Sequence, residues 1–163
     1  CSGSGGIPIA LGKALPGARV WGVELSPSAL EYFRRNIAGN GAGNVTAVAG
    51  DIFALPEEIT GRRYRVITAN PPYIPRGELA GLQAEVQREP ALALDGGADG
   101  LDFYRRLPAL CRPLLETDGW LLLEIGEGQE AAVSGFLKAE GFGKVEVIKD
   151  LSGLERNIAA AFS

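Results

Sequence analysis

Apolar residues along the chain fall into two alternating patterns, short continuous runs and runs spaced as on one face of a helix. The short runs are rich in β-branched and aromatic residues, which is typical of buried strands. The other segments carry apolar residues at helical spacing, as at Leu30, Phe33 and Ile37. Because the two patterns alternate, they predict an α/β fold with a mostly parallel sheet and crossover helices. Strands are expected at 19–25, 45–49, 64–69, 120–125, 144–148 and 158–162, and helices at 7–15, 27–39, 101–115 and 130–140.

The stretch 74–100 shows neither pattern, apart from a short helix expected around 79–88. A loop of that length inside a compact domain usually covers a site. The last two strands form a closing pair joined by the polar, glycine-containing stretch 149–157, and the C-terminal strand is expected to run antiparallel.

The composition fits one globular domain. The chain has 163 residues, of which 46% are hydrophobic and 22% charged, near the averages of folded proteins. No apolar run approaches the roughly 18 to 20 residues that cross a bilayer, and no secretion signal is visible, so we expect a cytoplasmic protein. The net charge of −4 argues against a protein that binds the nucleic-acid backbone.

The absence of histidine excludes hydrolases that use Ser-His-Asp or Cys-His catalysis, and it removes the commonest zinc ligand. The two cysteines, Cys1 and Cys111, cannot form a disulfide framework or a four-thiolate metal site. We therefore expect no metal site, and we predict that Cys111 is a small core residue on an apolar helix face.

The stretch Asn70-Pro71-Pro72-Tyr73 directly follows the apolar run 64–69. A carboxamide, a rigid turn without N–H donors and an aromatic face would lie together there at the edge of a sheet. This set suits a planar amide or amino group, whose two N–H donors need acceptors and whose π-face needs a ring. The hypothesis that follows is methyl transfer to such a nitrogen. The alternative is an ordinary turn at the end of a strand, because Asn-Pro and Pro-Pro are frequent there.

The glycine-rich stretch Gly3-Ser4-Gly5-Gly6 precedes a predicted helix. Glycines there let the backbone approach a ligand, and the start of a helix favours an anionic group. Glu24 ends the next strand about twenty residues later, where a carboxylate can accept both hydroxyls of a ribose. Asp51 ends the third visible strand, where it could accept from an adenine amino group while Ile52 packs on the ring. Each acid alone could be a helix cap or part of a solvated turn, but the ordered set favours a cofactor that contains a nucleoside.

A dinucleotide such as NAD would also use glycines and an acid. Two observations disfavour it. The loop reads Gly-x-Gly-Gly rather than Gly-x-Gly-x-x-Gly, and the Asn-Pro-Pro-Tyr turn has no role in hydride transfer. A methyl donor therefore fits the two sets of residues better.

With these residues placed, the chain resembles the catalytic domain of the protein-(glutamine-N5) methyltransferases that act on peptide chain release factors. The resemblance covers essentially all 163 residues. The Asn-Pro-Pro-Tyr motif alone is shared with adenine-N6 DNA methyltransferases, whereas the block from Glu89 to Leu101 is far more selective for the glutamine class. The matching stretches are Cys1-Ser2-Gly3-Ser4-Gly5, Asn70-Pro71-Pro72-Tyr73-Ile74, Glu89-Pro90-x-x-Ala93-Leu94-x-Gly96-Gly97-x-Asp99-Gly100-Leu101, Leu123-Glu124-Ile125-Gly126 and Asp150-Leu151-x-Gly153-x-x-Arg156, with Glu24 and Asp51 as single acids.

The resemblance implies a Rossmann-like class I fold, S-adenosylmethionine as the cofactor, and a release factor as the protein partner. The methyl acceptor would be the glutamine of the release factor's Gly-Gly-Gln motif. No membrane, metal or sequence-specific nucleic-acid partner is expected. The residues expected to bind the cofactor are Cys1, Ser2, Gly3, Ser4, Gly5, Glu24, Asp51, Ile52 and Asn70, and those expected to hold the glutamine amide are Asn70, Pro71, Pro72 and Tyr73.

The chain also departs from the family pattern. Cys1 stands where glycine is frequent, and the first strand of the sheet is missing, together with the acid expected before the loop. The helical N-terminal domain, which the resemblance associates with recognition of the protein substrate, is missing as well. Residues 1–163 are therefore expected to form one methyltransferase catalytic domain, truncated at its N-terminus and weakly active or inactive alone.

Three alternatives stay open. Glutamine methylation of a ribosomal protein would use the same chemistry and the same motif. Adenine-N6 methylation of DNA or RNA shares the motif, but it predicts a basic face and a pocket for a flipped base. A non-catalytic binding module would keep the fold without turnover.

Overall fold

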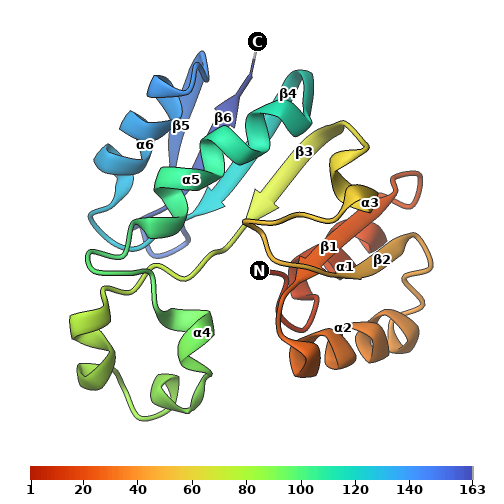
Figure 1. Cartoon of the computed structure of the whole chain (residues 1–163), viewed down its shortest axis with the longest axis horizontal. Coiled ribbons are helices and arrows are strands. Elements are labelled where there is room, and N and C mark those ends of the chain that lie inside the picture. The colour runs from red at the N-terminus through yellow and green to blue at the C-terminus, as the bar shows by residue number, and fades with distance from the viewer. Residues whose placement is uncertain (163) are drawn as a thin grey trace. The chain divides into compact units, whose positions relative to one another are not determined.

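The computed structural model describes residues 1–162. The chain divides into two compact units, the first spanning Cys1–Arg62 and the second starting at Arg63. Strands and helices alternate in both, so the predicted α/β class is confirmed (Figure 1). No helix in the described range combines the length and the apolar character needed to cross a membrane.

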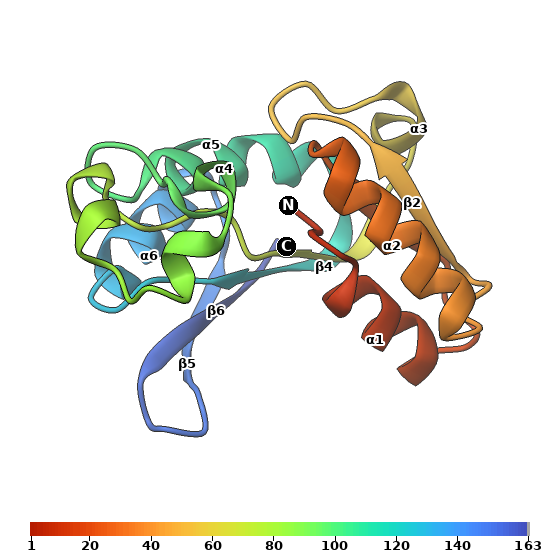
Figure 2. The same cartoon turned by 90° about the horizontal axis from the view of Figure 1, so that it is seen from below.

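Unit one is a parallel pair of strands with two helices packed on it. β1 (Val20–Glu24) pairs with β2 (Val45–Ala49), and both were predicted. The helices α1 (Gly6–Ala14) and α2 (Pro27–Gly39) pack against these strands and against each other (Figure 2). A short helix, α3 (Glu57–Thr60), follows β2 and was not predicted from the apolar pattern.

The predicted start of α2 is confirmed. The Ser26 hydroxyl oxygen accepts a hydrogen bond from Ala29 N at 3.4 Å, and Pro27 occupies the first turn, where no N–H donor is needed. The apolar face of the helix then turns inward, because burying it stabilises the unit. The core of unit one comprises Ile9, Leu30, Phe33, Ala42 and Val45.

Unit two is a four-stranded mixed sheet with the strand order β3-β4-β6-β5. β3 and β4 run parallel, whereas β6 is antiparallel to both β4 and β5, which confirms the antiparallel C-terminal strand. The helices α5 and α6 lie side by side, and α6 packs on β5 and β6 (Figure 1). The strands are β3 (Tyr64–Ala69), β4 (Leu115–Glu124), β5 (Lys144–Lys149) and β6 (Glu155–Ala161), and the helices are α5 (Asp102–Cys111), the 3-10 turn η3 (Arg112–Leu114) and α6 (Glu130–Ala139).

The segment between β3 and α5 has no long helix or strand, as expected, but it contains three short helices where the sequence predicted one around 79–88. Its two ends are joined by hydrogen bonds, because Ile74 N donates to the Leu94 carbonyl at 3.1 Å and Gly96 N donates to the Ile74 carbonyl at 2.9 Å. The segment therefore leaves the end of β3 and returns to it. The short helices are η1 (Arg76–Gly81), η2 (Val86–Arg88) and α4 (Ala91–Leu94).

Cys111 lies in the core of unit two, as predicted. Its side chain is buried, and burial raises the pKa of its thiol to about 12, so the thiol is inert at neutral pH. The Tyr104 ring is also fully buried, and its hydroxyl donates to the Glu124 carbonyl at 2.5 Å. The largest fully buried side chains of unit two include Tyr104, Leu107, Leu121, Leu123, Ile125, Val133, Leu137 and Ile158.

Three predicted element boundaries were wrong. The helix predicted over 101–115 ends at Cys111, because Pro113 has no amide hydrogen and α-helical bonding stops there. β4 begins at once, but its regular pairing with β3 resumes only at Trp120, where the strand was predicted to start. β6 starts at Glu155 rather than 158, since its first, polar residues already pair with β5.

Candidate functional site

Two acidic residues lie at adjacent strand ends in unit one. β1 and β2 pair in parallel with Glu24 opposite Ala49, and Gly50 N donates to the Glu24 carbonyl at 3.0 Å. Glu24 and Asp51 therefore lie at the same carboxyl edge of the strand pair, where the sequence pattern places them. Ligands of open α/β folds bind at such edges.

The Glu24 carboxylate holds the glycine-rich loop. One of its oxygens accepts Gly3 N at 2.7 Å and the other accepts Ser26 N at 2.8 Å, and the residue is only 8% exposed. Ser2 N adds a bond to the Val23 carbonyl at 3.1 Å. Each carboxylate oxygen keeps a further lone pair, so Glu24 can order the loop and still accept hydroxyl donors.

Gly5 lies where the loop meets α1, and the structure requires glycine there. Its φ is 90°, and a Cβ at this position would overlap the fully buried ring of Phe33. Asn36 of α2 fastens the same loop, because its side-chain amide donates to the Ser4 carbonyl at 2.9 Å. These contacts have no signal in the sequence, since Phe33 and Asn36 occupy ordinary positions of an amphipathic helix.

Asp51 takes part in the turn after β2. Its Oδ1 accepts Phe53 N at 2.8 Å, which is the turn contact expected under the alternative interpretation of this acid. Carboxylate acceptor sites remain for a ligand, and the neighbouring Ile52 is half-buried. Cys1, the first residue of the glycine-rich loop before α1, is exposed.

In unit two, Asn70 directly follows β3 and is exposed, whereas Pro71 and Pro72 are buried. Neither proline has an N–H donor and each has a fixed φ, so the turn is rigid. Within residues 1–162, the Asn70 side chain makes no hydrogen bond to another protein group. Its carboxamide is thus exposed to solvent next to a rigid turn whose two prolines are buried.

Tyr73 is enclosed by glycines. A Cβ at Gly96 would lie 2.8 Å from Tyr73 Cα, and one at Gly126 would lie 3.1 Å from the ring atom Cδ2. At Gly100, where φ is 77°, a Cβ would overlap the Tyr73 carbonyl. These glycines belong to stretches that carry the family resemblance, and the structure gives them a common role in packing around Tyr73.

Burial raises the pKa of the Tyr73 phenol above its usual value, and the nearby carboxylate of Glu124 raises it further. The Arg156 guanidinium opposes these effects, and Glu89 adds to them. The phenol therefore stays protonated at neutral pH, so Tyr73 offers a ring and an O–H donor rather than a base.

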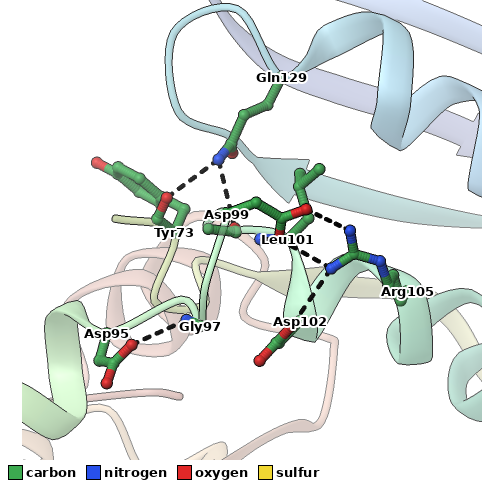
Figure 3. A network of polar contacts seen from close by, with 9 residues as sticks. Tyr73, Asp95, Gly97, Asp99, Leu101, Asp102, Arg105 and Gln129 are labelled. Carbon is green, nitrogen blue, oxygen red and sulfur yellow. Dashed lines mark hydrogen bonds and ion pairs between the residues drawn. The ribbon is translucent and has the colours of Figure 1, made fainter. Parts of the chain in front are cut away.

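Gln129, at the start of α6, was missed by sequence reasoning. Its Nε2 donates to the Tyr73 carbonyl at 3.0 Å (Figure 3) and to the Gly100 carbonyl at 3.3 Å, and its Oε1 accepts Gly126 N at 2.9 Å. One signal was available. Gln129 occupies the N-cap position, where glutamine is not a favoured residue, and its side chain does not cap the helix.

Two exposed ion pairs fix the loop before α5. Arg105 binds Asp99, and this contact lowers the pKa of the Asp99 carboxyl to about 2 (Figure 3). Asp95 accepts Arg76 Nε and Gly97 N, each at 2.9 Å, and the bond from Arg76 lowers its pKa. Within the described part of the chain, no group of three or more histidine, cysteine, aspartate or glutamate side chains is arranged to hold a metal ion.

Comparison with known proteins identifies relatives. A release factor glutamine methyltransferase of Geobacter sulfurreducens is 44% identical over 155 residues, which cover 94% of this chain and 53% of that protein. One of Thermodesulfovibrio yellowstonii is 40% identical over 157 residues, which cover 96% of this chain and 55% of that protein. The chain thus spans about half the length of the curated relatives it matches.

A crystal structure of a methyltransferase from Pyrococcus furiosus has the same fold, with a TM-score of 0.70 at 18% identity. The match covers 98% of this chain and 71% of that chain. The family described as "Methyltransferase domain" matches residues 1–89, which include the glycine-rich loop, both acids and the Asn-Pro-Pro-Tyr turn. The chain therefore belongs to the methyltransferase domain family.

Proposed function

We propose that this protein transfers a methyl group from S-adenosylmethionine to the side-chain N5 of a glutamine in a peptide chain release factor. One observation carries the proposal. The exposed Asn70 carboxamide stands on a turn made rigid by Pro71 and Pro72, in a chain about two-fifths identical to proteins named for this reaction. Because release factors act in translation, we place the protein in the cytoplasm.

The donor set of unit one fits a nucleoside cofactor. Glu24 and Asp51 lie at one edge of the β1–β2 pair, and each carboxylate retains acceptor sites beyond its backbone bonds. The loop that Glu24 orders leads into the N-terminus of α1 through the positive φ of Gly5. We assign Glu24 to the ribose hydroxyls, Asp51 and Ile52 to the adenine, and residues 1–5 to the remaining part of the cofactor.

The Asn-Pro-Pro-Tyr turn would orient the acceptor amide. The Asn70 side-chain oxygen and the Pro71 carbonyl each accept one N–H of the substrate carboxamide, while the Tyr73 ring walls the amide plane. A carboxamide nitrogen is a poor nucleophile, because its lone pair is delocalised into the carbonyl. Holding it in line with the methyl group can therefore supply roughly 7 to 11 kcal/mol of the barrier.

When bound, S-adenosylmethionine supplies an electrophilic methyl group on a sulfonium. Transfer would join the methyl carbon to the amide nitrogen held by Asn70 and Pro71 with loss of the carbon–sulfur bond, so the second product would be S-adenosylhomocysteine. The alkylated nitrogen is acidic and releases one proton to water, leaving N5-methylglutamine. No side-chain base is needed for this proton, which agrees with a chain that has no histidine and with a Tyr73 phenol that stays protonated.

Replacement of Glu24 tests the cofactor assignment. Glu24→Ala is expected to weaken S-adenosylmethionine binding roughly 10- to 100-fold in a calorimetric titration, because hydrogen bonds to a charged group are lost. Glu31→Ala, which removes an exposed carboxylate from α2, is the matched control. Since Glu24 also orders the loop, circular dichroism must show that the variant is folded at the assay temperature. Unchanged affinity in a folded variant would remove Glu24 from the site.

A labelling assay tests the reaction itself. The purified protein is incubated with methyl-labelled S-adenosylmethionine and, separately, with release factor, ribosomal protein and DNA. We expect label in the release factor, and none in a release factor whose Gly-Gly-Gln glutamine is replaced by alanine. Label in the ribosomal protein or in DNA would redirect the proposal to that acceptor. Cofactor binding without transfer to any of them would indicate a binding module.

A further inference from the structure

The Gln129 side chain joins three segments of unit two through one planar group. It contacts the Tyr73 carbonyl after β3 (Figure 3), the Gly100 carbonyl at the end of the loop before α5, and Gly126 N after β4. Gln129 is half-buried, and all three partners are backbone groups. Their positions are therefore coupled to one side chain rather than set by each segment alone.

We propose that Gln129 is a positioning residue for the Asn-Pro-Pro-Tyr turn. By fixing the Tyr73 carbonyl, it holds the turn in the place from which Asn70 and Pro71 accept the substrate amide. This inference rests on the proposed function, because the turn needs accurate placement only if it orients an acceptor. Gln129 acts through Tyr73 and is assigned no contact with the reacting atoms.

The chemistry of the three contacts requires a carboxamide. Two of the partners are carbonyl oxygens that need N–H donors, and the third is an N–H that needs an acceptor. A glutamate would direct a carboxylate at two carbonyl oxygens, and a lysine would offer no acceptor to Gly126 N. The space is also limited, because a Cβ at Gly100 would lie 2.8 Å from Gln129 Nε2.

The most informative variant is Gln129→Glu. It keeps the size of the side chain and the acceptor for Gly126 N but loses both donors. The kcat for methylation of release factor is expected to fall roughly 100-fold, which is the cost of displacing the acceptor amide by about 1 Å. S-adenosylmethionine affinity is expected to stay within about twofold, because the assigned cofactor residues other than Asn70 lie in unit one.

Gln87→Glu is the matched control. The Gln87 side chain also donates to two backbone carbonyls, those of Ala80 at 3.1 Å and Leu82 at 2.7 Å, but both lie in its own segment of short helices. Its replacement removes the same number of donors, and kcat is expected to stay within about twofold. An equal loss of kcat in both variants would assign the effect to general loosening of unit two and overturn the inference.

A pH profile separates positioning from packing. Protonation of the carboxyl introduced by Gln129→Glu restores one donor, so the ratio of variant to wild-type kcat is expected to rise as the pH falls. Gln129→Met has similar volume and no polar group, so it should lose a similar share of kcat. Its ratio of variant to wild-type kcat should not change with pH. A methionine variant with wild-type kcat would overturn the inference.

Hydrogen exchange tests the contact without using activity. Backbone amides in 70–76 and 95–102 are expected to exchange roughly tenfold faster in Gln129→Glu than in wild type, and at the wild-type rate in Gln87→Glu. If wild type methylates no acceptor, the proposed function fails, and the exchange data still judge the contact. If wild type is active while Gln129→Glu keeps both its kcat and its exchange rates, only the inference about Gln129 fails.

Discussion

Asn70→Ala is expected to remove most methylation of the release factor while leaving S-adenosylmethionine binding almost intact. The predicted fall in kcat is roughly 100- to 1,000-fold, the size seen when one group that orients or stabilises a transition state is removed. The reason is geometric. Without the Asn70 oxygen, the Pro71 carbonyl alone holds the substrate amide, and the amide can rotate its π-face away from the methyl group.

The structure makes this variant a clean test. Asn70 is exposed, and among residues 1–162 its side chain has no hydrogen-bond partner, so truncation should change the free energy of unfolding by about 0.5 kcal/mol or less. Loss of activity would then report on the reaction rather than on folding. Asn40→Ala, at the C-terminal cap of α2, is a suitable control because it removes another exposed carboxamide.

Two measurements decide the role of Asn70. Single-turnover methylation gives the rate of transfer, and a calorimetric titration gives the affinity for S-adenosylmethionine. We expect the rate to fall and the affinity to stay within about threefold of wild type, since most of the assigned cofactor contacts are made by other residues. Parallel losses of rate and affinity would contradict the assignment of Asn70 to the acceptor amide.

The elements that the sequence predicted well have local signals. The β-branched runs of β1 and β2 and the Ser26-Pro27 start of α2 each specify their own structure within a few residues. The end of α5 has no such clarity, because Leu114 and Leu115 continue the apolar pattern beyond the helix. Leu114 lies in the 3-10 turn η3 and Leu115 begins β4, and both are buried. The spacing of apolar residues alone does not distinguish these elements from a continued helix.

The residues of the candidate site likewise divide into those with a local signal in the sequence and those without one. Glu24 ends its strand, Asp51 and Asn70 follow theirs in the sequence, and a parallel strand pair brings Glu24 and Asp51 to a common edge. Gln129 lies 56 residues from the Tyr73 carbonyl that it binds, so its unusual place at a helix start could mark the residue but not reveal this partner. The loop from Gly96 to Gly100 stood out only through family resemblance, and its physical reason is the close approach of its backbone to Tyr73.

The largest effect on stability is expected at the loop of unit one. Gly5→Ala should lower the free energy of unfolding by roughly 2 to 6 kcal/mol, the sum of two separate costs. A non-glycine residue at φ 90° is strained by about 1 to 3 kcal/mol. The added Cβ would also overlap the Phe33 ring, and overpacking a core of this kind costs roughly 1 to 3 kcal/mol more.

The overlap is hard to relieve, because Phe33 is fully buried among Ile9, Leu30 and Val45. Gly6→Ala is the matched control at the next residue. Gly6 has no positive φ, no atom lies within 4 Å of a Cβ built there, and it begins α1. Alanine at this position should be neutral or stabilise the protein by up to about 1 kcal/mol.

Urea unfolding followed by circular dichroism gives the free energy for each variant, and the affinity for S-adenosylmethionine is measured under folding conditions. If Gly5→Ala and Gly6→Ala unfold alike, the loop can move away from Phe33, and the glycine at position 5 is not needed for packing. A loss of affinity without a loss of stability would then assign Gly5 to the approach of the ligand. If Gly5→Ala loses both stability and affinity while Gly6→Ala loses neither, packing against Phe33 sets the shape of the cofactor loop.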